Sequence, residues 1–181
     1  LGIACLNEIL TKAEEIIANE ILNKLREQLI KSLRQTGGKD DITRDSIEMS
    51  LCVIDFNNKK LQYAGAFRPL YLIRNNILSE IKGDFMPIGM YEGLKNPFSN
   101  KEIKFEANDI IYMFSDGYVD QIGGPDRKTF RSKKFKELLT EVHLKPMHEQ
   151  KAILEKKFGE WKRDVEQIDD ILVMGIRFSK S

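Results

Sequence analysis

The chain has 181 residues, which is enough for one ordinary domain with a substantial core, and its composition gives no sign of a second domain. Its 29 Lys and Arg residues almost balance its 28 Asp and Glu residues. The formal net charge of +1 argues against nucleic acid as the main partner, because nucleic-acid-binding surfaces are strongly basic. The apolar runs are far shorter than a membrane span, so we expect a soluble, cytoplasmic chain that an upstream region could tether to a membrane.

The first part of the chain is predicted to be helical. Residues 1–10 are apolar in a helical pattern, and because the sequence opens inside this pattern we expect it to begin partway through a domain. Thr11 and Glu14 match a capping box, which predicts the start of a long amphipathic helix. Its apolar face comprises Ile16, Ile17, Ile21, Leu22, Leu25, Leu29, Ile30 and Leu33. The Gln-Thr-Gly-Gly run at residues 35–38 is predicted to end it.

Short β-rich runs follow these helices. They predict strands at residues 49–55, 61–66, 70–74, 77–81 and 103–105. Asn75 and Asn76 separate two of the runs and predict the tight turn of a hairpin. Because the first four runs, up to residue 81, are consecutive and their connections are short, we expect these four to form an antiparallel meander.

Residues 110–114 form the run around which the sequence is organised. Five consecutive apolar residues are too few for a helix and too continuous for a half-exposed strand, so they predict a strand buried on both faces. The run stops at Ser115, Asp116 and Gly117. An acidic side chain at the junction of a buried strand and a glycine turn is well mounted to bind a metal ion. Alternatively, Asp116 is a turn residue that bonds its own backbone, and this stretch alone leaves both interpretations open.

Two helices and a last strand complete the predicted order. Residues 133–142 and 147–163 have helical periodicity, with Pro146 at the start of the second helix, and residues 171–178 predict a strand. Consecutive strands with helices grouped separately predict an α+β fold in which helices pack on sheet faces.

Asp169 and Asp170 lie at the mouth of this last strand. Adjacent residues on a strand point to opposite faces, so both carboxylates can aim at one point only if the strand has not yet begun. A divalent cation would remove the repulsion between carboxylates brought together. Oxygen donors without a nearby Cys or His favour magnesium or manganese over zinc.

The cysteines and histidines do not form a site. Cys5 and Cys52 are predicted to be buried free thiols, with a disulfide between them as the lesser alternative. His143 and His148 are not at metal-ligand spacing with any other histidine, so we expect surface or helix-end residues.

Two basic features have a structural and a functional interpretation. Arg68, beside Pro69, either shapes a strand boundary or clamps a phosphate. The basic run between Arg127 and Lys136 is either a solvated helix start or a surface that receives a phosphorylated partner. The solvated helix start is the favoured interpretation.

Four fragments together carry a family resemblance. They are residues 64–74 (Ala-Gly-Ala-Phe-Arg-Pro-Leu-Tyr-Leu-Ile-Arg), 86–89 (Met-Pro-Ile-Gly), 115–121 (Ser-Asp-Gly-Tyr-Val-Asp-Gln) and 167–170 (Gln-Ile-Asp-Asp). In their order and spacing, along essentially the whole chain, the sequence resembles the SpoIIE-like branch of the PPM (type 2C) serine/threonine protein phosphatases of bacteria.

The resemblance implies a β-sandwich flanked by helices, with two manganese or magnesium ions at one edge. It makes Asp116 and Asp169 the candidate catalytic, metal-binding aspartates, places Asp170 beside the second ligand as a further metal candidate, and adds Gly117 and Arg68 to the site. It implies hydrolysis of phosphoserine or phosphothreonine on a regulatory protein, typically of the anti-anti-sigma type, under the control of an upstream sensor domain.

The resemblance also implies a departure from the family pattern. The first metal motif of the family, an aspartate-bearing strand with a Thr-Gly-His-Gly-like turn, would lie before Leu1. We therefore expect residues 1–181 to be the C-terminal three quarters of a single SpoIIE-like domain that lacks at least one metal ligand and is itself inactive. The alternative is a catalytically silent PPM-like module that binds a partner through the helix at residues 16–33. A homodimer is a further expectation.

Overall fold

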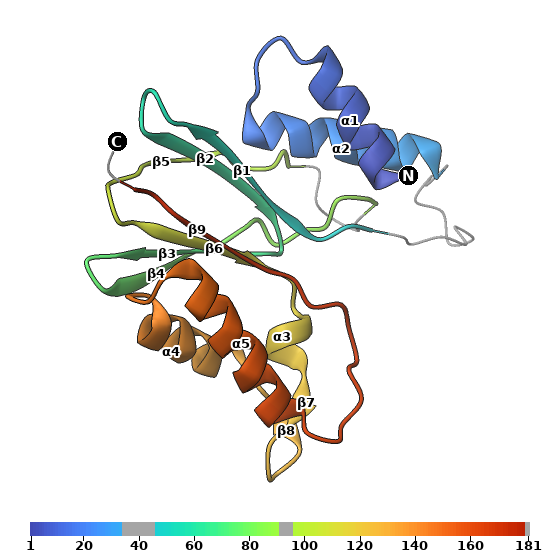
Figure 1. Cartoon of the computed structure of the whole chain (residues 1–181). Helices are drawn as coiled ribbons and strands as arrows, with labels where there is room; N and C mark the ends of the chain where they lie inside the picture. The colour runs from blue at the N-terminus through green and yellow to red at the C-terminus, as the bar shows by residue number, and fades with distance from the viewer. Residues whose placement is uncertain (34–45, 91–95, 180–181) are drawn as a thin grey trace. The chain divides into compact units, whose positions relative to one another are not determined.

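The computed structural model describes residues 1–33, 46–90 and 96–179 (Figure 1). The chain divides into two compact units, which we describe separately. The first comprises Leu1–Leu70 and Lys82–Phe105, and the second comprises Tyr71–Ile81 and Glu106–Ser181. Within the described ranges, no helix combines the length and the apolar character that crossing a bilayer requires.

The first unit packs two helices against a three-stranded antiparallel sheet. The helices are α1 (Gly2–Lys12) and α2 (Ala18–Ser32), and the sheet has the order β1 (Met49–Asp55), β2 (Lys60–Ala66), β5 (Lys101–Lys104). Helix α2 buries one apolar stripe in the core of this unit, formed by Ala18, Ile21, Leu22, Leu25 and Leu29. The predicted apolar face is therefore confirmed at Ile21, Leu22, Leu25 and Leu29, whereas Ile16 and Ile17 precede the helix.

The predicted capping box is wrong. Thr11 lies in the last turn of α1, and its Oγ1 donates a hydrogen bond to the carbonyl oxygen of Asn7 at 2.8 Å. A threonine hydroxyl can bond the carbonyl four residues earlier, and that bond competes with capping. Helix α2 instead starts at Ala18, whose N–H donates to Oε1 of Gln62 at 3.2 Å. The predicted stop at residues 35–38 lies outside the described residues.

The second unit contains a four-stranded sheet in the order β4 (Ile77–Ile81), β3 (Leu70–Arg74), β6 (Ile110–Phe114), β9 (Val173–Arg177). Strand β6 pairs antiparallel with both β3 and β9, and four of its five residues are buried, as predicted. Asn75 and Asn76 have φ values of 50° and 65°, which suit the hairpin turn predicted between β3 and β4.

The predicted meander is wrong at one connection. Strand β2 pairs with β1 and β5, whereas β3 pairs with β4 and β6, so the two consecutive strands belong to different sheets. The chain between them cannot extend the ladder, because Phe67 has a left-handed φ of 58° and Pro69 has no N–H to donate. The mixture of helices with antiparallel sheets confirms the α+β class.

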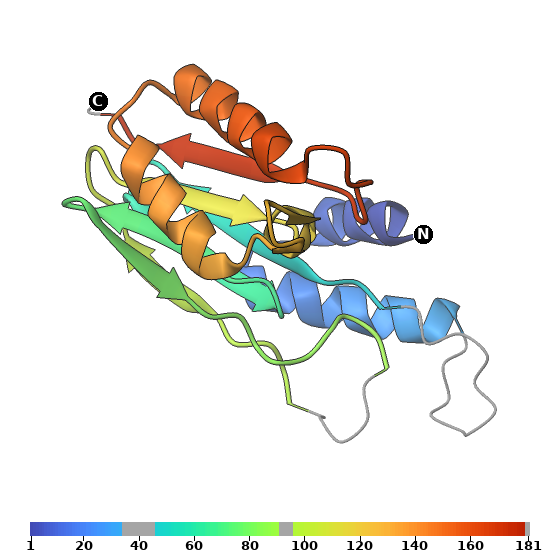
Figure 2. The same cartoon turned by 90° about the horizontal axis from the view of Figure 1, so that it is seen from below.

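Helices α4 (Ser132–Val142) and α5 (Met147–Lys162) belong to the second unit, and Figure 2 shows α5 running beside β9. Both helices follow the predicted ranges closely, and Pro146 is the N-cap of α5. An aromatic core fixes the short helix α3 (Gly117–Asp120) beneath them. The Tyr118 ring lies 4.8 Å from that of Phe135, and the Tyr118 hydroxyl donates to the carbonyl oxygen of Leu154 at 2.9 Å.

Candidate metal centre

The candidate centre begins where strand β6 ends. Ser115 follows the strand, and Asp116 is the N-cap of α3, where its carbonyl oxygen accepts the Asp120 N–H at 2.9 Å. Asp116 is half-buried, and Tyr118, two positions later, belongs to the aromatic core. The carboxylate is therefore mounted between two rigid elements, a buried strand and a packed helical turn.

Ser115 joins this stretch to the segment that precedes β9. Its N–H donates to the carbonyl oxygen of Leu172 at 3.0 Å, and its Oγ accepts the N–H of Leu172 at 2.9 Å. The same hydroxyl donates to the carbonyl oxygen of Asp170 at 2.8 Å. The antiparallel pairing of β6 and β9 is thus extended beyond Phe114 and Val173 by the backbone N–H and the side chain of Ser115.

Gly117 is the point of closest approach between the two segments. A Cβ atom at this position would overlap the carbonyl oxygen of Asp170 and lie 3.2 Å from that of Asp169. Glycine is required here because the backbone of another segment occupies the space of a side chain. The structure therefore brings Asp116 and Gly117 against the backbone of Asp169 and Asp170, more than 50 residues along the chain.

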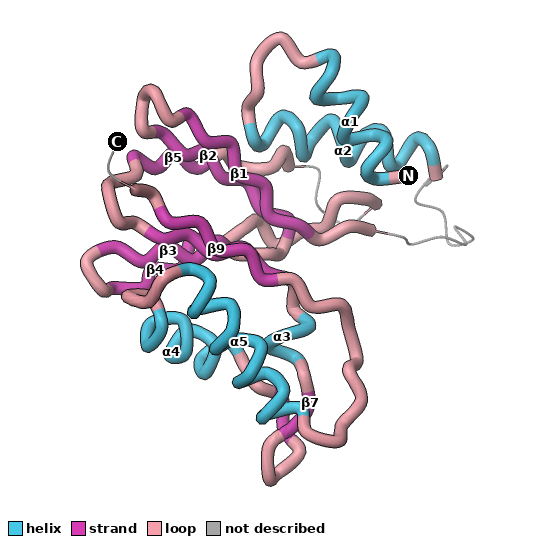
Figure 3. The backbone as a smooth tube through the Cα atoms, viewed as in Figure 1, coloured by secondary structure: helices cyan, strands magenta, loops and turns pink. Residues whose placement is uncertain are grey.

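Asp169 and Asp170 lie in the loop between α5 and β9, which Figure 3 shows as a continuous loop segment. Strand β9 begins only at Val173, so the opposite facing of adjacent strand residues does not apply to the two aspartates. Both are exposed. Oδ1 of Asp169 accepts the N–H of Asp170 at 2.7 Å, and the carbonyl oxygen of Asp169 accepts Nε2 of Gln167 at 2.8 Å.

The oxygen donors present are of the kind that binds a hard divalent cation, but they do not form a complete site. Asp116, Asp169 and Asp170 offer carboxylate oxygens at one end of the sheet, accessible from solvent, which is the chemistry that magnesium and manganese prefer. Yet residues 1–33, 46–90 and 96–179 contain no group of three or more His, Cys, Asp or Glu arranged to hold an ion. Within these ranges, Asp116, Asp169 and Asp170 are therefore not arranged as one ion-binding group.

Arg68 belongs to the first unit. Its Nη2 lies 2.6 Å from Oε2 of Glu48, and its carbonyl oxygen accepts hydrogen bonds from the Tyr63 hydroxyl at 2.5 Å and from Oγ of Ser50 at 3.2 Å. These contacts support the interpretation of Arg68 as a residue that shapes a strand boundary.

The other titratable candidates are buried or paired with neighbouring residues. Cys5 and Cys52 are free thiols, as predicted, and burial raises the pKa of Cys52 to about 12. His143 ends α4 with its Nε2 2.9 Å from Oδ1 of Asn76. In the basic run, Nζ of Lys136 lies 2.5 Å from Oε2 of Glu80. These pairings leave the aspartates as the candidates for chemistry.

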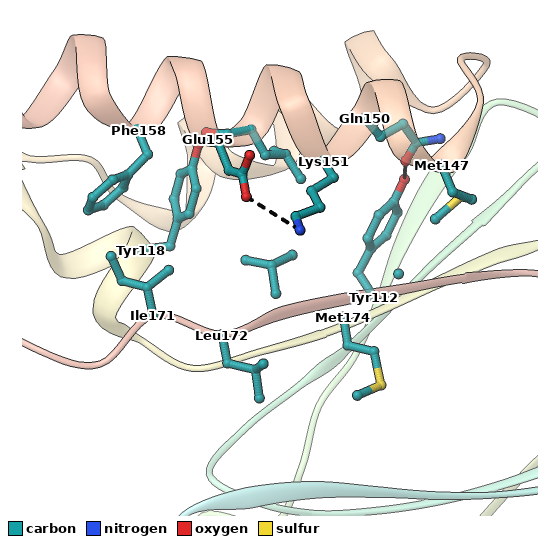
Figure 4. Close-up of a pocket in the computed structure, with 13 residues that line it drawn as sticks. Tyr112, Tyr118, Met147, Gln150, Lys151, Glu155, Phe158, Ile171, Leu172 and Met174 are labelled. Atoms are coloured by element: carbon teal, nitrogen blue, oxygen red, sulfur yellow. Dashed lines mark hydrogen bonds and ion pairs between the residues drawn. The ribbon is translucent and has the colours of Figure 1, made fainter.

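A cavity of about 520 Å³ lies along β9 but does not include the candidate ligands (Figure 4). One face of α5 and the consecutive residues 171–175 form its walls. The Tyr112 hydroxyl donates to Oε1 of Gln150 at 2.6 Å inside it, and Nζ of Lys151 lies 3.7 Å from Oε1 of Glu155. Its lining is mainly apolar, so it does not supply the oxygen donors that a metal centre needs.

Sequence reasoning missed the importance of Ser115 and Gln121. Both lie in the stretch already identified, Ser115 directly before Asp116 and Gln121 five positions after it, and a polar residue near a candidate ligand is the signal that could have found them. Their partners, Asp170 and Glu166, are distant in sequence, so their roles became visible only in the folded chain.

Comparison with known proteins agrees with this fold. Residues 4–179 match the family described as Stage II sporulation protein E (SpoIIE). The solved SiaA PP2C domain of Pseudomonas aeruginosa is 22% identical with a TM-score of 0.87, over 99% of this chain and 68% of that chain. The SpoIIE phosphatase domain of Bacillus subtilis is 18% identical with a TM-score of 0.61, over 99% and 74%.

A structure of the RsbU and RsbW domains of a Mycobacterium tuberculosis protein is 17% identical with a TM-score of 0.69, over 98% of this chain and 46% of that chain. No curated protein sequence matches the chain significantly. The structural likenesses show the fold of PP2C phosphatase domains. The chain therefore belongs to the SpoIIE family of PPM-type phosphatases.

Proposed function

We propose that this chain forms most of the phosphatase domain of a cytoplasmic, metal-dependent protein serine/threonine phosphatase that acts on a phosphorylated regulatory protein. The observation that carries the proposal is the contact between residues 115–117 and residues 169–172, which joins the backbone beside Asp116 to that of Asp169 and Asp170. Membership in the SpoIIE family supports the same reaction class.

In this proposal Asp116 and Asp169 are ligands of magnesium or manganese, and Asp170 is a further oxygen donor. The B. subtilis SpoIIE structure was presoaked with manganese and a structure of RsbX contains magnesium, and both support this choice of ion. A bound divalent ion supplies positive charge that activates a water molecule and stabilises the charge that develops on the phosphoryl oxygens. The complete centre holds two ions, so the three aspartates alone are expected to bind weakly.

The properties of Cys52 and of the exposed aspartates bear on which group acts as the nucleophile. Cys52 is a poor nucleophile at neutral pH, because burial raises its pKa to about 12 and keeps the thiol protonated. Asp169 and Asp170 are exposed and can meet a phosphorylated side chain from solvent. A water molecule is therefore the proposed nucleophile.

The proposed substrate is a small regulatory protein of the anti-anti-sigma type that carries phosphoserine or phosphothreonine, and an upstream sensor domain is proposed to control the activity. The occurrence of RsbU and RsbW domains together in the M. tuberculosis structure supports a regulatory partner, as does a B. subtilis SpoIIE structure that includes a fragment of its regulatory domain.

Ile3, 80% exposed on α1, supports a further apolar contact such as a homodimer.

Replacement of the two aspartates tests the proposal. In the full-length protein, Asp116→Ala and Asp169→Ala are each expected to abolish manganese-dependent release of phosphate from a phosphoserine peptide. Asp126→Ala is a suitable control, because Asp126 is exposed and 3.4 Å from Lys128 on the β7–β8 hairpin (β7 Ile122–Gly123, β8 Lys128–Thr129). Normal turnover by either Asp116→Ala or Asp169→Ala would overturn the assignment.

A second candidate is a catalytically silent PPM-like module that binds a signalling partner. The observation that favours it is the lack, among the described residues, of any group of three or more metal-binding side chains. Manganese titration of the full-length protein separates the two functions. If the wild type binds manganese and Asp116→Ala does not, the enzyme is supported. If the wild type and Asp116→Ala bind manganese equally weakly, the silent module is supported.

A further inference from the structure

We infer that Gln121 is a positioning residue, which fixes the segment that carries Asp169 and Asp170 to the segment that carries Asp116. The inference deepens the proposed function, on which it rests for what the aspartates bind. It is carried by the contacts of Gln121 itself, which do not depend on any ion.

Gln121 follows helix α3 directly, and its side chain is completely buried at 0% exposure. Nε2 donates to the carbonyl oxygen of Glu166 at 2.9 Å and to that of Ile122 at 3.0 Å. Glu166 is three residues before Asp169. The amide group therefore connects the end of the Asp116 segment to the loop that carries the other two aspartates.

The backbone of Gln121 fixes the start of the same loop. Its carbonyl oxygen accepts Nε1–H of Trp161, in the last turn of α5, at 3.0 Å. In return, the carbonyl oxygen of Trp161 accepts the N–H of Gly124 at 2.7 Å. A Cβ atom at Gly124 would lie 2.7 Å from the indole ring, so the turn packs tightly against the tryptophan.

The loop between α5 and β9 is thus held at both ends. Gln121 and Trp161 hold its start, and Ser115 holds its end through Asp170 and Leu172. Asp169 lies between these two points, and Asp116 lies between Ser115 and Gln121 on the opposing segment. An exposed loop loses conformational entropy when its side chains converge on an ion. Fixing both ends of the loop beforehand reduces that loss.

The hydrogen bonds of Gln121 allow its effect on the loop to be tested separately from its effect on overall stability. Its Oε1 is buried and has no hydrogen-bond partner among the described residues. An unpaired buried acceptor costs about 1–3 kcal/mol. Gln121→Leu removes that cost while it loses the two Nε2 bonds to the carbonyl oxygens of Ile122 and Glu166, so the two effects on stability oppose each other. The overall stability is therefore expected to change little.

Gln150 provides a matched control within the same unit. It is equally buried, at 1% exposure, but its amide is fully paired. Nε2 donates to the carbonyl oxygens of His143 and Lys145 at 3.0 and 2.8 Å, and Oε1 accepts the Tyr112 hydroxyl at 2.6 Å. None of these partners lies in the loop at residues 163–172. Gln150→Leu is therefore expected to lower the melting temperature without loosening that loop.

Amide hydrogen exchange of the chain and the two variants tests the inference. In Gln121→Leu, the hydrogen-bonded amides of Val165 and Asp170 are expected to exchange about tenfold faster than in the wild type, with the melting temperature nearly unchanged. In Gln150→Leu, their exchange is expected to stay at the wild-type rate. A manganese titration followed by NMR line broadening is expected to show about tenfold weaker binding for Gln121→Leu alone.

Wild-type exchange at Val165 and Asp170 in Gln121→Leu would overturn the inference, and so would equal acceleration in Gln150→Leu. If Gln121→Leu fails to fold, Trp161→Phe keeps an aromatic side chain but loses the Nε1–H donor together with part of the indole, and it is expected to change exchange in the same direction. A wild-type protein with no Asp116-dependent manganese binding would overturn the proposed function, while the exchange rates still decide the role of Gln121.

Discussion

The hydroxyl of Ser115 donates a hydrogen bond to the carbonyl oxygen of Asp170 at 2.8 Å, across 55 positions of sequence. Oγ of Ser115 also accepts the N–H of Leu172, so one small side chain satisfies two backbone groups of the loop before β9. The candidate metal centre is organised around this contact, because it holds the loop against the residue next to Asp116.

Removal of this hydroxyl is expected to weaken the proposed metal centre. Ser115→Ala leaves two backbone groups of the loop without their partner, which is expected to cost about 1 kcal/mol of stability. It is also expected to weaken manganese binding about tenfold, because the loop loses its anchor at the Asp170 end. Ser115→Thr keeps the hydroxyl and should restore binding. Isothermal titration with manganese measures the effect, and equal affinities for Ser115→Ala and the wild type would contradict it.

A methyl group at Gly117 is expected to disrupt the contact between the two segments. The new Cβ would overlap the carbonyl oxygen of Asp170, a backbone atom that cannot rotate away. Gly117→Ala should therefore abolish phosphatase activity in the full-length protein and lower its melting temperature.

Gly159 on α5 is the matched control, because a Cβ there meets nothing within 4 Å. Gly159→Ala is expected to raise stability by about 0.5–1 kcal/mol through the higher helix propensity of alanine. Thermal unfolding of the two variants should move in opposite directions. A shift of the same sign in both would show that the contact at Gly117 is not close.

Loss of the carboxylate of Asp109 is expected to destabilise the second unit. Asp109 is 2% exposed and accepts bonds from Nε of Arg74 at 3.0 Å and from its Nη2 at 2.6 Å, as well as from the N–H of Glu106 at 2.8 Å. Asp109→Ala should cost about 3 kcal/mol, because it removes the buried carboxylate that accepts guanidinium hydrogen bonds and the N–H of Glu106, while the ion pair of Arg74 with Glu106 remains. Denaturant unfolding measures the loss. The exposed pair of Asp126 and Lys128 is the comparison, and Asp126→Ala should cost close to nothing.

Stability is expected to fall between pH 10 and pH 12. Burial raises the pKa of the Tyr71 and Tyr112 phenols to about 12, whereas a phenol in the unfolded chain titrates near 10. In this window the unfolded state loses protons that the folded state keeps, so each tyrosine lowers the free energy of unfolding by about 1.4 kcal/mol per pH unit. Tyr112→Phe removes one of these groups and should flatten the slope. Urea titrations at several pH values check it, and an unchanged slope would contradict the assignment.

Much of the fold follows from local pattern. The buried run at residues 110–114, the Asn75 and Asn76 turn and the start of α5 after Pro146 all depend on neighbours within a few residues, and all three are as predicted. The capping box at Thr11 failed because two local hydrogen bonds compete for one hydroxyl, and the sequence does not reveal which one forms.

The sequence by itself determined which residues are candidates for metal binding. Asp116, Asp169 and Asp170 stand out because carboxylates sit at the ends of short apolar runs, and the family of the chain follows from such fragments in order. Only the tertiary structure decided how these residues are held. The Ser115 hydroxyl, the bare backbone at Gly117 and the buried amide of Gln121 act across more than 40 positions, and contacts at that separation exist only once the chain has folded.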